Sequence, residues 1–219
     1  MKIVRLIQQQ DPDILALQEY SPNGEISSQF AYSYEEVQGG RSPYGMSIFS
    51  QYPILNTGSL DFDDSANNAI FIDVLKGNDT LRVYNVHLES LGVKPDSLHL
   101  SGINEKDSRK LLNRLTSAFK KQQDQVEKFN QHKMTCRYPI ILCGDLNNTF
   151  YSWAYRNLKG DLNDSFVEAG KGFGKTYSFN GYPLRIDFIL SDPKFKINEH
   201  RNFEVGLSDH EPVLSRLSN

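Results

Sequence analysis

The chain has 219 residues, of which 38% are hydrophobic and 23% charged, which corresponds to one domain with a substantial core. Its net charge of −3 argues against a surface that is basic throughout, so a polyanion would have to bind through a local patch or through metal ions. No segment has the roughly 20 apolar residues of a membrane span, and the N-terminus lacks the apolar core of a signal peptide. We expect a soluble domain; the composition favours no particular compartment and is compatible with a membrane tether upstream.

The first predicted element is a helix, Lys2–Gln10, whose apolar residues recur at helical spacing. Asp11-Pro12-Asp13 ends this helix, and the apolar run Ile14–Leu17 follows it. Later strand candidates are rich in β-branched, Leu and Phe residues and are bounded by Gly, Pro, Asn or Asp. They are Gly45–Ser50, Ala69–Leu75, Leu81–Leu88, Pro139–Cys143, Arg185–Leu190 and Pro212–Leu217. Several are apolar on both faces, which indicates sheets covered on both sides, as in a layered α/β protein.

A long helix is predicted between about Glu105 and Gln131, where apolar residues form a single stripe. Basic side chains align beside this stripe: Lys110, Arg114, Lys121 and Lys128. Two interpretations of this basic flank stay open. We favour a solvated flank whose lysine stems cover the edge of the core over a rail that binds a polyanion. Farther along, Cys136 and Cys143 lie close together near an apolar run, which indicates buried thiols and not a disulfide framework.

Two long segments are predicted to be irregular, Glu89–Asn104 and Lys171–Pro183. Loops of this length in a compact domain tend to carry function. In the second segment, glycines alternate with aromatic residues that include Tyr177, and the segment directly precedes Arg185. We expect it to overhang a functional site, where its aromatic rings would stack on a base, border a lipid or pack internally.

Five short segments carry polar groups at the ends of predicted strands. They are Leu15-Ala-Leu-Gln-Glu19, Tyr84-Asn-Val-His87, Ile140-Ile-Leu-Cys-Gly-Asp-Leu-Asn147, Arg185-Ile-Asp-Phe-Ile-Leu190 and Gly206-Leu-Ser-Asp-His-Glu-Pro-Val213. Each segment alone has an ordinary structural interpretation as a turn cap, a hydrogen bond or a salt bridge. Five such sets are hard to place in one core without a common polar cavity. We therefore predict that they converge on one site.

The carboxylates of Glu19 and Asp209 are hard oxygen ligands of the kind that Mg²⁺ prefers, and Mg²⁺ keeps waters free for a substrate phosphate. If His210 meets Asp187 in space, the carboxylate can hold the imidazole in one tautomer and stabilise its charge as it takes a proton. On a strand, alternate residues share a face, so Arg185 and Asp187 should point the same way, with a structural salt bridge as the plain interpretation.

If these groups converge, Asp145 would orient or deprotonate a water molecule, and Asn147 and His87 would donate hydrogen bonds to an anionic centre. Such an assembly suits phosphoester hydrolysis, because positioning and neutralisation of charge supply most of the rate of that reaction. Substrate-binding candidates are Arg185, Tyr177 and Arg41.

The ordered motifs resemble the endonuclease/exonuclease/phosphatase family, the group with the deoxyribonuclease I fold. The matching motifs are Leu17-Gln-Glu19, Tyr44-Gly-Met-Ser-Ile-Phe-Ser-Gln-Tyr-Pro-Ile54, Asn85-Val-His87, Gly144-Asp145-Leu-Asn147, Arg185-Ile-Asp187 and Ser208-Asp209-His210. Each is weak alone, but together they span nearly the whole chain in a specific order. The resemblance implies an α/β (α+β) protein, a four-layer α/β/β/α sandwich in which two mostly antiparallel sheets pack face to face with helices outside.

The resemblance also implies a phosphoesterase site at one sheet edge that depends on Mg²⁺, with Mn²⁺ as the alternative ion. Glu19 would be the principal metal ligand and Asp209 a second. The water and the phosphate would be oriented by Asp145 and Asn147. His210, paired with Asp187, and His87 would hold the phosphoryl oxygens or exchange protons, and the resemblance leaves open which of the two histidines is the general base. Arg185 looks like a position that holds the site or the substrate.

One departure from the family pattern concerns the N-terminus. The family usually opens with a strand carrying an Asn that supports the metal site, and Met1 falls where that strand should already have ended. We expect residues 1–219 to be a single, N-terminally truncated catalytic domain that lacks one strand, which leaves either an unpaired edge or a gap that something else, such as a neighbouring molecule, fills. Our hypothesis is that metal affinity and turnover are weaker than in a version extended upstream.

The sequence thus predicts a metal-dependent phosphoesterase, foremost a phosphodiester hydrolase. The expected substrates are nucleic acid, a phospholipid head group or an inositol phosphate, and no obligate protein partner is evident. The acidic balance outside the long helix and the lack of an Arg/Lys-rich loop disfavour extended contact with duplex nucleic acid. The alternative is a non-catalytic interaction module that keeps the fold.

Overall fold

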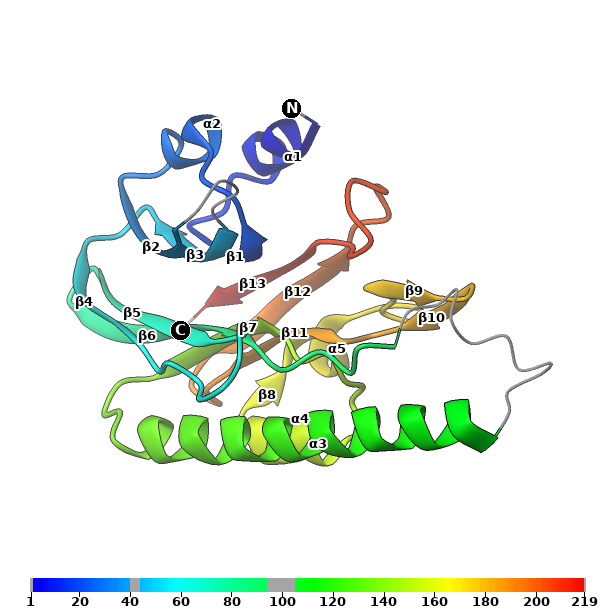
Figure 1. The fold of residues 1–219 in the computed structure, drawn as a ribbon. Coiled ribbons are helices and arrows are strands. Elements are labelled where there is room, and N and C mark those ends of the chain that lie inside the picture. Colours follow the sequence, from blue (N-terminus) through cyan, green and yellow to red (C-terminus); the bar gives the residue numbers. More distant parts are fainter. Residues whose placement is uncertain (1, 40–43, 94–104, 219) are drawn as a thin grey trace.

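A computed structural model describes residues 2–39, 44–93 and 105–218 and shows four layers: helices, a sheet layer, a second sheet layer and helices (Figure 1). The helices above the first sheet layer are α1 (Lys2–Gln10) and α2 (Gly24–Ser27). The helices on the opposite side are α3 (Glu105–Met134) and α4 (Trp153–Lys159), and α5 (Ser165–Ala169) packs against strand β12 (Lys196–Asn202). This layering confirms the predicted α/β/β/α sandwich.

The larger sheet has six strands in the order β4-β5-β6-β7-β11-β8. Its strands are β4 (Ile54–Ser59), β5 (Ala69–Lys76), β6 (Asp79–His87), β7 (Ile140–Asp145), β11 (Asp187–Ser191) and β8 (Asn163–Asp164). Neighbouring strands run antiparallel except β6 and β7, which are parallel and joined through α3, since parallel neighbours need a crossover connection. The two strands therefore end at the same edge, with His87 opposite Asp145.

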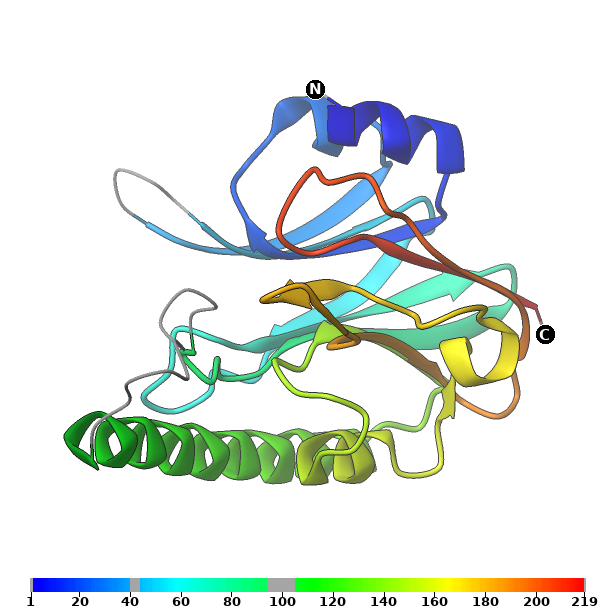
Figure 2. The ribbon, with the colours of Figure 1, turned by 90° about the vertical axis from the view of Figure 1, so that its right-hand side faces the viewer.

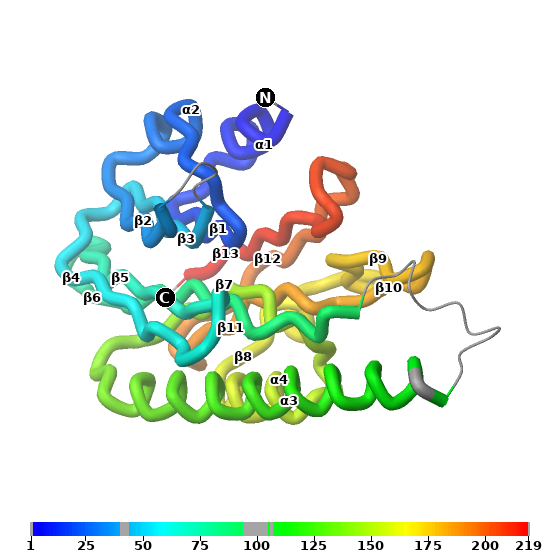
Figure 3. The backbone as a smooth tube through the Cα atoms, in the orientation of Figure 1, coloured from blue at the N-terminus to red at the C-terminus, as the bar shows by residue number. Residues whose placement is uncertain are grey.

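The facing layer contains a three-stranded antiparallel sheet in the order β1-β3-β2, with β1 (Ile14–Tyr20) at one edge. Its other strands are β2 (Tyr32–Gln38) and β3 (Tyr44–Ser50). The antiparallel pair β12 and β13 (Val213–Ser218) lies on the same side of the six-stranded sheet, and β13 packs against β11 (Figure 2). A short hairpin, β9 (Tyr177–Phe179) and β10 (Tyr182–Leu184), extends beside the loop between β12 and β13 (Figure 3).

Three hydrophobic clusters hold the four layers together. One packs α3 and α4 onto the six-stranded sheet and includes Phe129 and Leu142. A second lies between the sheets and joins Ile48 of β3 to Ile72 of β5. The third packs α1 and α2 onto β1 and β3 and includes Val4. Burial of this apolar surface is the main force that stacks the layers and thereby fixes which strand ends come together.

The elements agree with most of the predictions from sequence. The helix Lys2–Gln10 is confirmed, and the long helix runs on to Met134. The expected strands correspond to β3, β5, β6, β7, β11 and β13. Cys136 and Cys143 are free thiols, as predicted, but both residues are half-buried and not fully buried as expected. Across the described ranges, no helix combines the length and apolarity needed to cross a bilayer.

Two expectations are wrong. The segment Lys171–Pro183 is not irregular throughout, because it contains β9 and the start of β10. The strand expected at Arg185–Leu190 begins at Asp187, so Arg185 is outside it and does not follow the alternation of its faces. Most of the other long segment, Glu89–Asn104, falls at residues 94–104, outside the described part of the chain.

Candidate active site

The polar strand ends line one cleft of about 570 Å³. Among the residues that line it are Gln18, Glu19, Tyr44, Met46, Asn67, His87, Leu91, Asp145, Asn147, Asn148, Tyr177, Phe179, Asp187, Asp209 and His210. They come from both sheets, from the β9–β10 hairpin and from the loop between β12 and β13. The convergence expected from the sequence is therefore present in the structure.

The centre of the cleft lies at the ends of the parallel strands β6 and β7. His87 Nε2 is 3.6 Å from Asp145 Oδ2, and both side chains are buried. The backbone N–H of Asn147 donates to Asp145 Oδ1 at 2.7 Å, and the backbone N–H of Leu88 donates to the Asp145 carbonyl at 3.0 Å. The first hydrogen bond holds the Asp145 carboxylate and the second holds its backbone, which leaves Oδ2 facing the two imidazoles.

His210 bridges two carboxylates. Its Nδ1 lies 3.0 and 3.1 Å from the two oxygens of Asp187, and its Nε2 lies 3.8 Å from Asp145 Oδ2. The ring of Tyr177 packs on the imidazole with centroids 4.9 Å apart, and a backbone bridge joins the same two residues. The β9 strand thus holds His210 over the ends of β7 and β11.

The two histidines are driven to opposite protonation states. Burial, and to a smaller extent the nearby charge of His210, lower the pKa of His87 to about 4. Burial also acts to lower the pKa of His210, but its hydrogen bond to Asp187 and the charges of Asp187, Asp145 and Asp209 outweigh burial and raise it to about 9. Near neutral pH the site therefore contains one neutral and one positively charged imidazole.

Asp145 has a raised pKa. Burial is the main cause, and the negative charge of Asp187 adds to it, while the charge of His210 and the hydrogen bond from Asn147 oppose it. The charge of Glu19 also contributes to the increase. A carboxylate with a raised pKa is a better proton acceptor than an ordinary aspartate.

Glu19 and Asp209 both line the cleft with exposed carboxylates. Glu19 has φ of 49°, where the β1–β3 register shifts between Leu17 and Tyr20, so a local irregularity at the strand end presents its side chain. Their charges act on the centre of the cleft, since Glu19 raises the pKa of Asp145 and Asp209 raises that of His210. Both lie on the same side of the molecule as His87 and Asp145.

A group able to hold a metal ion also forms within the cleft. Asp145, Asp187 and His210 offer ligand atoms that all lie within 4.8 Å of one another. This group differs from the predicted pair, Glu19 and Asp209, although all five residues line the same cleft. Four carboxylates in one cleft provide the oxygen donors that Mg²⁺ and Mn²⁺ favour, so the residues present fit a hard divalent cation.

The outcome differs among the three candidate substrate-binding residues. Tyr177 lines the cleft, and the charges of Asp209 and Asp145 add to the burial that raises its pKa. Arg41 lies outside the described residues. Arg185 is buried and is not among the described residues that line the cleft; its Nη1 pairs with Asp164 at 2.8 Å.

The expected shared face of Arg185 and Asp187 is wrong, because the chain enters β11 only at Asp187. The Arg185 guanidinium instead lies against three aromatic rings, those of Phe150, Phe166 and Phe188, at 4.7 to 5.2 Å from their centroids. The plain interpretation, a structural salt bridge, describes this residue, with Asp164 as its partner.

The basic side chains along α3 form ion pairs and hydrogen bonds with neighbouring loops. Lys121 pairs with Glu89 at 3.1 Å, and Lys128 pairs with Asp63 at 3.0 Å. Arg114 donates to a loop carbonyl at 2.8 Å. These contacts support the solvated flank over the rail that binds a polyanion.

One neighbour of the site, Asn85, is part of a matching motif in the sequence but had no role predicted for it. Asn85 is fully buried, donates to the carbonyls of Leu17 and Ser47 at 2.8 and 3.0 Å, and accepts a hydrogen bond from Gln18. It therefore joins β6 to the sheet that carries Glu19. The sequence feature that could have indicated this role is an amide side chain two residues before His87 on an apolar strand, since alternate residues of a strand share a face.

Comparisons with known proteins agree with this geometry. The family described as Endonuclease/Exonuclease/phosphatase family has a sequence model that matches residues 2–210. No curated protein sequence matches the chain significantly.

Several solved structures are similar to the chain. A mannosyl-6-phosphatase from Bacteroides thetaiotaomicron is 17% identical, with a TM-score of 0.67, covering 100% of this chain and 90% of the other. A humanized D. rerio TDP2 is 16% identical, with a TM-score of 0.72 and coverages of 100% and 90%. ANGEL2, a 2′,3′-cyclic phosphatase, is 15% identical, with a TM-score of 0.69 and coverages of 98% and 84%. At these identities the likeness shows a shared fold.

Proposed function

This chain belongs to the endonuclease/exonuclease/phosphatase family, and from that premise we propose that it is a divalent-metal-dependent hydrolase of phosphoric esters that acts foremost on phosphodiesters. One observation supports this proposal most directly. Asp145, Asp187 and His210 bring carboxylate oxygens and an imidazole nitrogen within 4.8 Å of one another, as an acid–base group, in a cleft where Glu19 and Asp209 supply further carboxylates. A binding module needs no such assembly of acid, base and metal-ligand groups.

Glu19 and Asp209 hold the metal ion in this proposal, with Mg²⁺ as the expected ion and Mn²⁺ as the alternative. Asp187 is occupied by His210 through both of its oxygens, and one oxygen of Asp145 accepts the Asn147 N–H. When bound, such an ion polarises a phosphoryl oxygen and neutralises charge that develops in the transition state.

Asp145 orients the attacking water and takes its proton. Its raised pKa favours that role, and the hydrogen bond from the Asn147 backbone holds the carboxylate in place. The Asn147 side chain donates to the carbonyl of Leu88 at 3.0 Å, which joins the turn after β7 to the segment after β6. These contacts hold Asp145, the proposed base, at a fixed distance from His87.

His210 serves as a proton-bearing donor to the phosphate. With Nδ1 directed at Asp187 and a pKa of about 9, the ring is charged at neutral pH, so Nε2–H is available to a phosphoryl oxygen. His87, with a pKa of about 4, is neutral and contributes a hydrogen bond without a charge. This division assigns the general base to Asp145 and not to His210.

The substrate classes in the proposal are nucleic acid, phospholipid head groups and inositol phosphates. Two of the similar structures are named as a mannosyl-6-phosphatase and a 2′,3′-cyclic phosphatase, which adds a sugar phosphate and a 2′,3′-cyclic phosphate to the candidate substrates. The cleft places Tyr44, Met46, Leu91 and Phe179 beside the polar centre, which gives an organic group next to the phosphorus an apolar wall. A panel of plasmid, abasic duplex, sphingomyelin, inositol phosphates, mannose 6-phosphate and a 2′,3′-cyclic nucleotide separates these classes.

The test is hydrolysis of a chromogenic aryl phosphodiester with Mg²⁺, with Mn²⁺ and with a chelator. We expect metal-dependent turnover that Asp145→Ala and His210→Ala each reduce by at least about 100-fold. Asp124→Ala, an exposed position on α3, is the matched control. Equal background rates for all four proteins, on this ester and on the panel, would leave the non-catalytic module as the function.

A further inference from the structure

We propose that Gln122 of α3 is a positioning residue for the hydrolytic reaction, because its side-chain amide joins the two segments that carry His87 and Asp145. The inference rests on the proposed function and adds a residue that the motifs at the strand ends do not contain. Gln122 lies in the middle of the long helix, outside the cleft, and is only 1% exposed.

The amide of Gln122 makes three hydrogen bonds. Its Nε2 donates to the carbonyl of Glu89 at 2.8 Å and to the carbonyl of Leu146 at 3.2 Å. Its Oε1 accepts from the Asn148 side chain at 3.0 Å. Both amide protons and the carbonyl oxygen are therefore used, and the contacts lie on two different segments.

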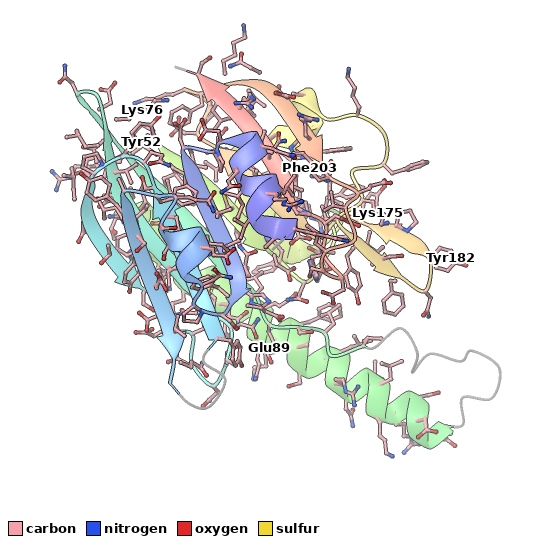
Figure 4. The ribbon with its side chains drawn as sticks, turned by 90° about the horizontal axis from the view of Figure 1, so that it is seen from above. Tyr52, Lys76, Glu89, Lys175, Tyr182 and Phe203 are labelled. Atoms are coloured by element: carbon pink, nitrogen blue, oxygen red, sulfur yellow. The ribbon has the colours of Figure 1, made fainter. Side chains whose placement is uncertain are left out.

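Those contacts fall immediately beyond the reacting groups. Glu89 is two residues after His87, and Leu146 directly follows Asp145. Figure 4 shows Glu89 beside α3, where the chain leaves β6. Because β6 and β7 both end at this edge, the helix amide sets the spacing of two chain segments that have left their strands.

A second glutamine one turn along reinforces the same segment. Gln125 is 4% exposed, its Oε1 accepts the backbone N–H of Glu89 at 2.8 Å, and its Nε2 donates to Ser65 at 3.2 Å. The peptide groups on both sides of Glu89 are thus held by α3. Residues three apart on a helix share a face, so one face of α3 carries both amides.

Only an amide of this length satisfies the site at Gln122. A glutamate would place a carboxylate oxygen against a carbonyl oxygen, and an apolar side chain would leave two carbonyls and the Asn148 amide without their partner. The expected consequence is a shift of the catalytic groups, since displacements of about 1 Å from remote changes cost on the order of 100-fold in rate.

The test compares Gln122→Met with Gln123→Met. Gln123 is the adjacent, exposed residue, and its amide reaches only Glu127 among the described contacts, so both variants make the same change of residue on the same helix. With the chromogenic phosphodiester and Mg²⁺, at a temperature where all proteins are folded, Gln122→Met should lower kcat about 10- to 100-fold and change KM less than about threefold. Gln123→Met should match the wild type.

A purely stabilising role gives a different result. In that case Gln122→Met lowers the melting temperature but leaves kcat per folded molecule equal to that of Gln123→Met, and the proposal is overturned. If Gln122→Met does not fold, Gln122→Glu replaces it, because it keeps the side-chain shape and donates one hydrogen bond when protonated. We expect Gln122→Glu to lower kcat to a value between those of the wild type and Asp145→Ala, and a kcat equal to that of Gln123→Met overturns the proposal.

A second readout does not need turnover. In metal-free protein, Gln122→Met should move the imidazole NMR resonances of His87, and Gln123→Met should not. Unchanged His87 resonances in a folded Gln122→Met protein overturn the inference. If the wild type hydrolyses no ester in the panel, the proposed function fails, while the resonances still decide whether Gln122 positions the site.

Discussion

Asp187 and His210 form a carboxylate–imidazole pair in which Nδ1 lies 3.0 Å from Oδ2 and 3.1 Å from Oδ1. Asp187 is also the register partner of Asp145 across β11 and β7, so the pair lies beside the carboxylate that faces both histidines. One strand pairing thus links the charge of His210 to the proton affinity of Asp145. The first two predictions follow from this link.

Replacing Asp187 with Asn should lower the pKa of His210 from about 9. Burial already acts to lower it, and the hydrogen bond and charge of Asp187 are the main forces that raise it. The measurement is an NMR titration of the imidazole resonances in metal-free protein. His132, on α3 in a different network, is the internal control and should titrate as in the wild type. An unchanged His210 titration would mean that Asp187 does not hold its charge.

The same pair should make stability depend on pH. The folded-state pKa of His210 is raised above the ordinary value of about 6.5, so its contribution is fully present below that pH and is lost as pH rises through about 9. We expect the difference in free energy of unfolding between wild type and Asp187→Asn to be largest below about pH 6.5 and to shrink toward higher pH. Denaturant melts of the metal-free proteins measure it, and a difference that grows with pH would contradict the assignment.

Much of the site was predictable because its chemistry lies at the ends of apolar strands. Asn85-Val-His87 and Gly144-Asp145-Leu-Asn147 each follow a buried run, and parallel pairing of β6 and β7 then places His87 opposite Asp145. Spacing alone did not give the grouping of Asp145, Asp187 and His210, since their ligand atoms lie within 4.8 Å of one another although the residues are far apart in the chain.

The misses have identifiable physical causes. Strands β2 and β12 carry mostly charged and polar residues, so their periodicity was weak, and pairing with β3 and β13 determines them. Arg185 was misplaced because the alternation of faces was applied two residues before the strand begins. The role of Gln122 was not predicted, because the sequence does not show which groups a polar residue in an apolar helical stripe will contact.

Arg185→Met should destabilise the fold without directly altering the cleft. The change leaves Asp164, which is 2% exposed, without its cationic partner, and loss of one member of a buried pair costs about 3–5 kcal/mol. Denaturant unfolding measures the cost. Adding Asp164→Asn removes the orphaned charge and should recover part of the loss. Arg201→Met, at a half-exposed pair, is the control and should cost less than about 1 kcal/mol.

Glu19→Gln tests which carboxylates hold the ion. If Glu19 and Asp209 are the ligands, removing the Glu19 charge should weaken binding of Mg²⁺ and Mn²⁺ at least about 10-fold, because even changes to groups that only support metal ligands cost that much. Titration calorimetry on the folded variant measures the affinity, and Glu168→Gln, an exposed position on α5, is the control.

Assigning the metal ion to the other group of ligands predicts the opposite order of effects for Glu19→Gln and Asp187→Asn. If the ion binds to Asp145, Asp187 and His210, Asp187→Asn weakens metal binding more than Glu19→Gln does. In our assignment Asp187→Asn changes the titration of His210 and leaves metal affinity close to that of the wild type, because both oxygens of Asp187 are committed to the imidazole. Metal affinity retained in Glu19→Gln and lost in Asp187→Asn would move the ion from the β1 side of the cleft to the end of β11.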